Sequence, residues 1–368
     1  MEKRAFTKND TMVIKGVAIL MMLFHHLYLD ASRYKGFAVD IAPFSKGLLT
    51  HTAQFGKLCV GIFLFLSAYG MTVSYKRMNA QYEFDRQTCG KSIAGRCLSM
   101  FSGYLFIFAI GIIGSVILKP EMLDIYGTGV KAGMYTLIDL LGLAYAFDTP
   151  TLLGTWWYMS LAYSLVVLLP VLLLLYRKLG ILAVSLLWLV GCRTVGGGEY
   201  NEICRWMFIG IIGLYFADRD LLPKIRAFLL GGESRYRVLF GAVSFLLLSV
   251  LLFGMLDFRH KVGDNLIDVF DCAAVVAIVL FGYTFLSAVR YLNTALVFLG
   301  KYSMNIFLFH SFIRIKWFNE FTYSFKYWWL IYLVLLADSL IAAILIDLLK
   351  KLTRYDKLTG FLLKRIRS

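Results

Sequence analysis

Two histidines and a lysine stand out because they are ionisable groups at the two ends of one apolar run. The run reads KGVAILMMLFHH and extends from Lys15 to His25 and His26. On an α-helix its eleven steps cover about three turns and about 16 Å, so Lys15 and His26 fall within about 20° of one face, and His25 points about 100° away. An imidazole can take a proton from a hydroxyl group near neutral pH, and an ammonium group binds anions. We therefore expect Lys15 and His26 to line one polar tunnel.

Asp30 follows His26 by one helical turn, about 40° round the helix, which is close enough to orient the imidazole ring. The same residues can also have simpler roles. The two histidines can mark a helix end and bind water, and Lys15 can extend its side chain to lipid phosphate. We place His26 ahead of His25 as the catalytic candidate because His26 shares the face of Lys15.

The elements that position these residues are predicted to be membrane helices. The chain has 368 residues, of which 60% are hydrophobic and 17% charged, and its mean hydropathy is +0.71. Soluble domains are nearer a quarter charged. The apolar residues here gather in runs of roughly twenty, the length that crosses a bilayer as an α-helix. The sequence therefore predicts an all-α polytopic bundle, organised as a single membrane domain over residues 1–368.

We expect about ten transmembrane helices, with boundaries read from the apolar runs. They cover about 11–29, 54–75, 97–118, 155–175, 180–194, 201–217, 238–256, 266–289, 294–313 and 327–349. Polar segments lie between them at 30–53, 76–96 and 218–237, and a basic tail follows from 350. The segment 119–154 is expected to be re-entrant or external, because its apolar core, 134–147, is short for a span and contains Asp139.

The charge distribution predicts the orientation. The formal net charge is +15, and with the N-terminus inside, 23 of the 38 Lys and Arg residues fall in cytoplasmic segments and 12 in external ones. This bias favours an N-in, C-in bundle, since short cytoplasmic loops are enriched in basic residues. The same placement indicates contact with lipid headgroups and argues against a nucleic-acid partner. Lys15 then lies near the cytoplasmic surface and His26 toward the outer one.

Four further residues are candidates for substrate binding. Arg96 precedes an expected span on the cytoplasmic side, where it can set topology or hold phosphates. Trp157 belongs to a WWY triplet that is typical of an interfacial aromatic belt, with sugar stacking as the alternative. Ser303 and His310 lie in the run GKYSMNIFLFH, where hydrogen bonding between helices is at least as well supported as catalysis.

Other chemistry is not indicated. The five histidines and six cysteines show no spacing typical of metal ligands, so we predict no metal site. Cys192 and Cys204 flank one expected external loop, where a disulfide is conceivable. No nucleophile elbow, zinc-protease, phosphate-loop or dinucleotide fingerprint occurs. Arg205 and Asp338 lie within expected spans and should have partners there.

The chain resembles the integral-membrane acyltransferase 3 family, whose bacterial members acylate cell-surface glycans. The likeness rests on the Lys15–His26 spacing and on four later motifs in the family's order: GIFLFLSAYG (61–70), WYMS (157–160), FIG (208–210) and the run GKYSMNIFLFH (300–310). Two departures are seen. Ala68 stands where glycine is usual, and only Arg96 remains of two expected arginines, without the accompanying proline.

The resemblance implies a ten-helix core that takes an acyl group, usually acetyl, from cytoplasmic acyl-CoA. Acetyl-CoA is then a co-substrate, and the acceptor is a hydroxyl of a glycan or lipid-linked sugar at the outer face of the bacterial plasma membrane. His26 would serve as general base or transient acyl carrier, while Lys15 and Arg96 would attract the phosphates of the coenzyme. Two alternatives remain: a transporter or flippase for an anionic or sugar substrate, and a binding or sensory component. Inverted repeats or broken helix pairs would favour the transporter, and the sequence shows neither. The sequence specifies no oligomeric state.

Overall fold

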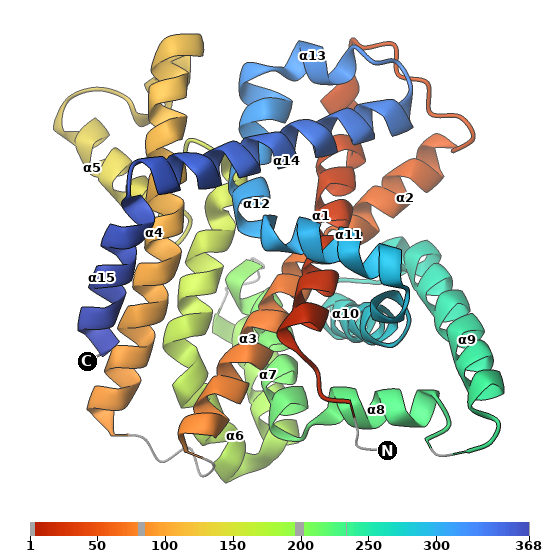
Figure 1. Cartoon of the computed structure of the whole chain (residues 1–368). Coiled ribbons are helices and arrows are strands. Elements are labelled where there is room, and N and C mark those ends of the chain that lie inside the picture. The colour runs from red at the N-terminus through yellow and green to blue at the C-terminus, as the bar shows by residue number, and fades with distance from the viewer. Residues whose placement is uncertain (1–3, 80–84, 196–201, 233, 368) are drawn as a thin grey trace. The chain divides into compact units, whose positions relative to one another are not determined.

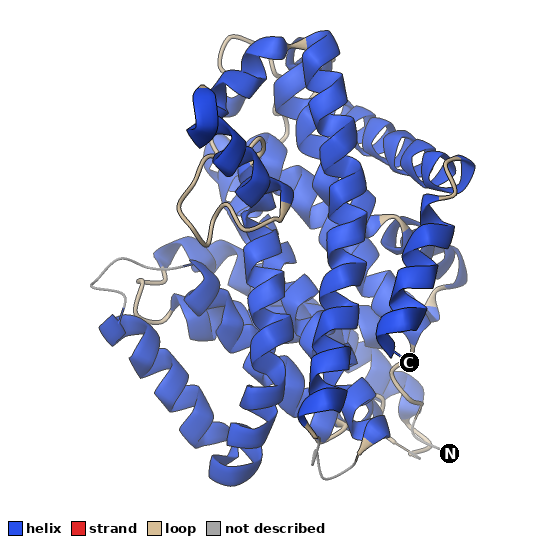
Figure 2. Ribbon diagram, turned by 90° about the vertical axis from the view of Figure 1, so that its left-hand side faces the viewer, coloured by secondary structure: helices blue, strands red, loops and turns tan. Residues whose placement is uncertain are grey.

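The protein is helical throughout the part of the chain that the structure describes. The computed structural model describes residues 4–79, 85–195, 202–232 and 234–367. Within these ranges no strand occurs (Figure 2), and the one β-bridge joins Asp40 to Tyr327. The predicted all-α class is thereby confirmed, and the helices are long and apolar enough for a polytopic membrane bundle.

The chain forms two compact units, each assembled from segments far apart in the sequence. The first unit contains residues 1–33, 43–83 and 169–301. Its helices are α1 (Lys8–Tyr28), α2 (Lys46–Gly56), α3 (Cys59–Met78), the later part of α6 (Trp157–Val195), α7 (Glu202–Asp218), α8 (Leu221–Leu229), α9 (Arg237–Phe258), α10 (Ile267–Thr284) and α11 (Arg290–Lys301). Short 3₁₀ helices η1 (Ala31–Tyr34), η4 (Arg259–Lys261) and η5 (Leu286–Ala288) lie between the longer helices.

The second unit contains residues 34–42, 84–168 and 302–368. Its helices are α4 (Arg86–Leu118), η2 (Pro120–Tyr126), α5 (Gly129–Leu140), η3 (Gly154–Trp156), the start of α6, α12 (Ser303–Ser311), the π-helical turn η6 (Phe312–Trp317), α13 (Asn319–Tyr323), α14 (Trp328–Leu352) and α15 (Tyr355–Arg367). Within this unit α15 runs beside α4 (Figure 1), where the Tyr355 hydroxyl donates to the Ser102 carbonyl at 2.9 Å.

Helix α1 is fixed at its start by a reciprocal cap and along its length by close packing. The Thr7 hydroxyl accepts a hydrogen bond from the Asp10 N–H at 3.2 Å, and the Asp10 carboxylate accepts one from the Thr7 N–H at 2.9 Å. Gly16 and Gly300 let α1 and α11 approach closely. A Cβ on Gly300 would collide with the Met12 carbonyl, and one on Gly16 with the Leu296 carbonyl. Such small-residue contacts are how membrane helices pack without a strong hydrophobic drive between them.

Asp139 organises the segment 119–154 of the second unit. Its fully buried carboxylate accepts hydrogen bonds from the Tyr126 hydroxyl at 2.6 Å, the Leu152 N–H at 2.7 Å and the Thr151 hydroxyl at 2.9 Å. The Tyr104 hydroxyl on α4 donates to the Asp139 carbonyl oxygen at 2.7 Å. Burial raises the pKa of the Asp139 carboxyl above its ordinary value. The helix that carries it, α5, has only 12 residues, well short of a span.

The ten predicted helices all have counterparts in the described residues. Within those residues, seven helices are long and apolar enough to cross a bilayer, or eight if the pair α11 and α12–η6 counts as one broken span. The two remaining predicted helices are the later part of α6 and α7. Gly180, with φ +81°, interrupts α6 where the sequence predicts a boundary, and α7 has 17 residues, the lower end of spanning length.

Several predicted boundaries were wrong. Helix α4 begins at Arg86 and not near 97, because the Asp85 side chain accepts a hydrogen bond from the Thr88 N–H and caps a helix that starts in the charged segment. Segments predicted as loops or tail contain α2, α8 and α15. The predicted continuous helix 294–313 is broken at Tyr302, so the chain does contain one broken pair.

Candidate active site

Lys15, His25 and His26 lie on α1, which runs without interruption from Lys8 to Tyr28. The predicted relation of Lys15 to His26 along one helical face is therefore confirmed. Lys15 is half-buried, and none of the described residues forms an ion pair with it. An ammonium group in this setting is available to a ligand.

His25 fastens α2 to α1. Its ring is buried, with 7% of its surface exposed, and its Nδ1 lies 2.8 Å from the Ala53 carbonyl oxygen. Because a carbonyl only accepts, Nδ1 must carry the proton, and Nε2 of the neutral ring keeps its lone pair. The helices are close here, since a Cβ on Gly56 would come within 2.6 Å of the Met21 carbonyl oxygen.

His26 lies beside His25 at the C-terminal end of α1. The ring is half-buried, and the two ring centroids are 5.0 Å apart at an interplanar angle of 66°. Arg33 caps this helix end, donating to the His26 carbonyl oxygen at 2.7 Å and to that of His25 at 3.3 Å. A guanidinium group is thus held at the main-chain carbonyls of the two histidines.

Asp30 lies beyond the end of α1 and is exposed. Its carboxylate accepts a hydrogen bond from the Ser32 N–H at 2.7 Å. The Ser32 hydroxyl and N–H hold the pKa of Asp30 below its ordinary value. The structure therefore gives Asp30 a role in the turn after α1, and its proposed influence on the His26 ring stays a prediction.

An ionic network that the sequence analysis did not assemble supports this end of the first unit. The Asp271 carboxylate on α10 is 1% exposed and lies 2.8 Å from both Nε and Nη2 of Arg259. Arg205 on α7 reaches the same carboxylate at 2.9 Å and Asp268 at 3.4 Å, so the partners expected for Arg205 are found. Two acids three residues apart on an apolar helix were the available sequence signal.

The same network reaches α2, whose Ala53 carbonyl binds the His25 ring. Arg259 Nη1 donates to the Gln54 carbonyl oxygen at 3.0 Å, and the neighbouring Ala53 carbonyl accepts from His25. Arg259 therefore fixes α2 beside the point at which α2 binds the His25 ring. Arg259 and Asp271 are positioning residues that the sequence analysis missed.

In the second unit, His310 and Trp157 lie on elements that contact each other. His310 is fully buried, and its Nδ1 lies near the Ile306 and Phe307 carbonyls, so Nε2 accepts from the Ser311 hydroxyl at 3.2 Å. At the start of α6, the Trp157 ring is half-buried, and its centroid lies 5.8 Å from that of the Tyr145 ring. Its neighbour Trp156 is the buried one and donates Nε1–H to the Leu308 carbonyl of α12 at 3.0 Å.

Ser303 and Arg96 lie on the contacting helices α12 and α4. Ser303 is buried at the first position of α12, and Arg96 is half-buried on α4. Two turns after Arg96, Gly103 packs against the Met304 side chain. The structure thus groups Arg96, Trp157, Ser303 and His310 within the second unit, and the α1 residues and Asp30 within the first.

Metal ligands and thiols are the other groups that could carry chemistry. Among the described residues, no three or more His, Cys, Asp or Glu side chains form a group suited to a metal ion. The six cysteines are free thiols, and Cys192 and Cys204 are close enough for a thiol–thiol hydrogen bond. Residues 196–201 of the external loop expected between these cysteines lie outside the described residues.

Comparison with known proteins identifies a family. A family model described as an acyltransferase domain matches residues 12–348, nearly the whole chain. No curated protein and no solved structure matches.

Proposed function

Because this chain belongs to the acyltransferase family whose model matches residues 12–348, it is a membrane acyltransferase, and we propose its donor, acceptor and catalytic base. The donor is cytoplasmic acyl-CoA, with acetyl as the acyl group. The acceptor is a hydroxyl of a cell-surface glycan or of a lipid-linked sugar at the outer face of a bacterial plasma membrane. The protein inserts with both termini in the cytoplasm.

The proposed reaction is an acyl transfer with His26 as general base. The His26 imidazole takes the proton of the acceptor hydroxyl while the oxygen attacks the thioester carbonyl. The carbon–sulfur bond breaks, and the departing thiolate of coenzyme A takes the proton from the imidazolium. In a second form, His26 itself attacks the thioester and passes the acyl group on. Both forms consume one thioester and one hydroxyl and release one ester and one thiol.

The remaining site residues bind the two substrates. Lys15 and Arg96 attract the phosphates of the coenzyme from the cytoplasmic side. Trp157, Ser303 and His310 of the second unit bind the acceptor, with Trp157 offering a ring on which a sugar can stack. His25 holds α2 and presents its neighbour, and Asp30 helps to orient the His26 ring.

One observation carries the proposal. An ammonium group without an ion-pair partner among the described residues and a histidine lie three turns apart on one face of a single uninterrupted helix, in a chain that belongs to an acyltransferase family. The helix spans about 16 Å between Lys15 and His26, which leaves room for an extended thioester arm between a phosphate-binding group and the base.

The test compares matched asparagine variants of the two histidines. The purified full-length protein in detergent is supplied with acetyl-CoA, and release of the free thiol is followed. We expect His26→Asn to abolish release. His25→Asn should retain activity, because the asparagine amide can still donate to the Ala53 carbonyl. Lys15→Ala should raise KM for acetyl-CoA with little change in kcat, and Lys15→Arg should restore it.

Two outcomes would count against this assignment. Full activity in His26→Asn removes His26 from the reaction, and loss confined to His25→Asn transfers the role to His25. A protein that moves a sugar or anion across vesicles without thiol release would be the transporter of the alternative hypothesis.

A further inference from the structure

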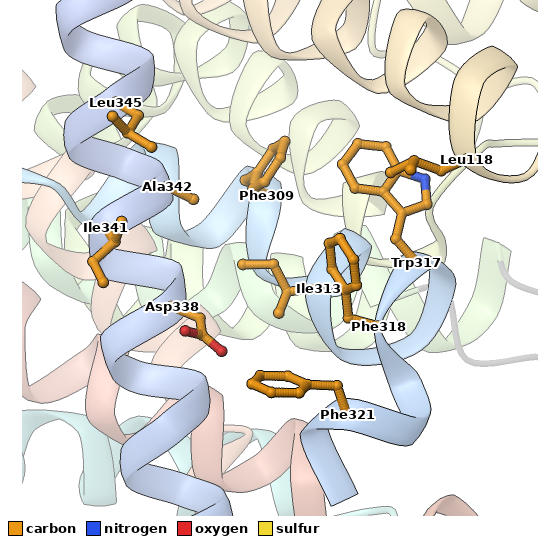
Figure 3. A pocket seen from close by; sticks show the side chains of 10 residues that line it. All are labelled: Leu118, Phe309, Ile313, Trp317, Phe318, Phe321, Asp338, Ile341, Ala342 and Leu345. Atoms are coloured by element: carbon orange, nitrogen blue, oxygen red, sulfur yellow. The ribbon is translucent and has the colours of Figure 1, made fainter.

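An apolar groove runs between two helices of the second unit. Its volume is about 540 Å³, within the range of about 300–1,000 Å³ typical of ligand pockets. One wall is α14 and the other is α12 with η6 and α13 (Figure 3). The lining comprises Leu118, Phe309, Ile313, Trp317, Phe318, Phe321, Asp338, Ile341, Ala342 and Leu345.

The groove follows from how the two helices are joined. Toward the N-terminal end of α12, the Asn305 amide donates to the Asp347 carboxylate at 2.7 Å and to the Ala343 carbonyl at 3.2 Å. Lys350 donates to the Asn305 amide oxygen at 3.1 Å, so α12 and α14 are tied together at this level. Beyond it, η6 follows α12 as a wider π-helical turn.

The two walls present different chemistry. Phe309, Ile313 and Trp317 recur every four residues along α12 and η6 and form one stripe. The Phe309 and Trp317 rings lie 5.6 Å apart, edge to face. Opposite this stripe, α14 contributes small and aliphatic side chains. A hydrocarbon chain fits such a lining.

Asp338 is the one ionisable side chain in the lining. Figure 3 shows its carboxylate pointing into the groove, near the Phe321 ring. Among the described residues no donor or cation interacts with this carboxylate. An acid within a membrane helix is costly unless it is paired, and such groups mark functional sites. The lining itself supplies no cation, so the partner must come from outside the lining.

We propose that this groove binds an amphiphilic amine, with its hydrocarbon chain against the aromatic stripe and its protonated nitrogen on Asp338. The charge of the lining selects this class of ligand. A single carboxylate attracts a cation, and the faces of the aromatic rings add cation–π attraction. The amine belongs to an aminolipid of the bilayer, because α14 is long and apolar enough to cross a membrane and its lining residues Ile341 and Leu345 are exposed. This site is independent of the transfer chemistry assigned to His26.

The test uses bromoalkyl probes, because bromine quenches a nearby tryptophan. The full-length protein in detergent is titrated with 12-bromododecylamine and with 12-bromododecanol, which has the same chain without the charge. Quenching of Trp317 is the difference between wild type and Trp317→Phe. We expect saturable quenching by the amine. The affinity for the amine should be weaker by about tenfold or more in Asp338→Asn, which is the loss expected for one charge-assisted hydrogen bond. The alcohol should bind wild type and Asp338→Asn with the same affinity.

A pair of tryptophan variants tests the location. Ala342→Trp fills the groove and should abolish amine binding, whereas Ala337→Trp adds the same side chain at an exposed position of α14 outside the lining and should leave binding intact. Nanodiscs with brominated phosphatidylethanolamine or phosphatidylglycerol separate the sources. Asp338-dependent quenching by phosphatidylethanolamine supports the aminolipid, and quenching only by the soluble amine overturns it in favour of a free amphiphile. Equal amine affinity in wild type and Asp338→Asn, or in Ala342→Trp, overturns the proposal.

Discussion

Replacing Asp271 by asparagine should destabilise the protein strongly. The carboxylate is 1% exposed and accepts three charge-assisted hydrogen bonds, from Arg259 at 2.8 and 2.8 Å and from Arg205 at 2.9 Å. Those guanidinium groups are only 10% and 15% exposed. The asparagine keeps the shape but leaves two buried cations beside an uncharged amide. Breaking a buried pair in this way costs about 3–5 kcal/mol.

The measurement is the free energy of unfolding in detergent, with Asp257→Asn as the matched control. Asp257 also pairs with a cation, Lys261 at 3.8 Å, but both side chains are more than half exposed. Its replacement should change stability by no more than about 0.5 kcal/mol. Equal unfolding free energies for the two variants would refute the reasoning. Because Arg259 also binds the Gln54 carbonyl, Asp271→Asn should in addition lower thiol release from acetyl-CoA.

Two further predictions concern packing and pH. Gly300→Ala should destabilise the protein by about 1–3 kcal/mol, because its Cβ meets the Met12 carbonyl. Gly254→Ala on α9 has open space and should be neutral or stabilising. The free energy of unfolding in detergent compares the two variants, and equal effects contradict the packing argument. The raised pKa of Asp139 means that the folded state binds this proton more tightly than the unfolded chain, so the stability it contributes is fully present below pH about 4 and is lost as pH rises through the folded pKa. The free energy of unfolding should decline from pH 4 to 8, and Asp139→Asn should reduce this decline. An unchanged slope against pH in the variant contradicts the prediction.

The spans were predictable because uncharged apolar runs of about twenty residues seldom occur outside membrane helices. The relation between Lys15 and His26 followed from helical geometry alone, since α1 contains no break. Hydropathy could not place the start of α4 at Arg86, because a helix can continue into water once Asp85 caps it. The break at Tyr302 lies in the short polar run GKYSMN, and it was missed because the apolar residues on both sides together have the length of one span.

The contacts that support the candidate site lay beyond sequence reasoning. Arg205 was recognisable as a buried cation that needs a partner, but Asp271 lies 66 residues away along the chain. The bond from His25 to Ala53 joins a polar imidazole to a main-chain carbonyl. Because every residue has such a carbonyl, the residue type does not indicate which one accepts a hydrogen bond. Tertiary structure was required to separate His25, which holds a helix, from His26 beside it.

Three contacts of different kinds hold α1, and they are made by glycines, by the His25 ring and by main-chain carbonyls. Main-chain packing against α11 depends on Gly16 and Gly300, the His25 ring binds α2, and the Arg33 cap takes only carbonyl oxygens. A helix whose supporting contacts do not draw on the Lys15 ammonium is what a positioned cation requires. It follows that a change at Lys15 should alter chemistry with little loss of stability. His25→Ala, which removes the donor to Ala53, should instead loosen α2 and lower both stability and activity.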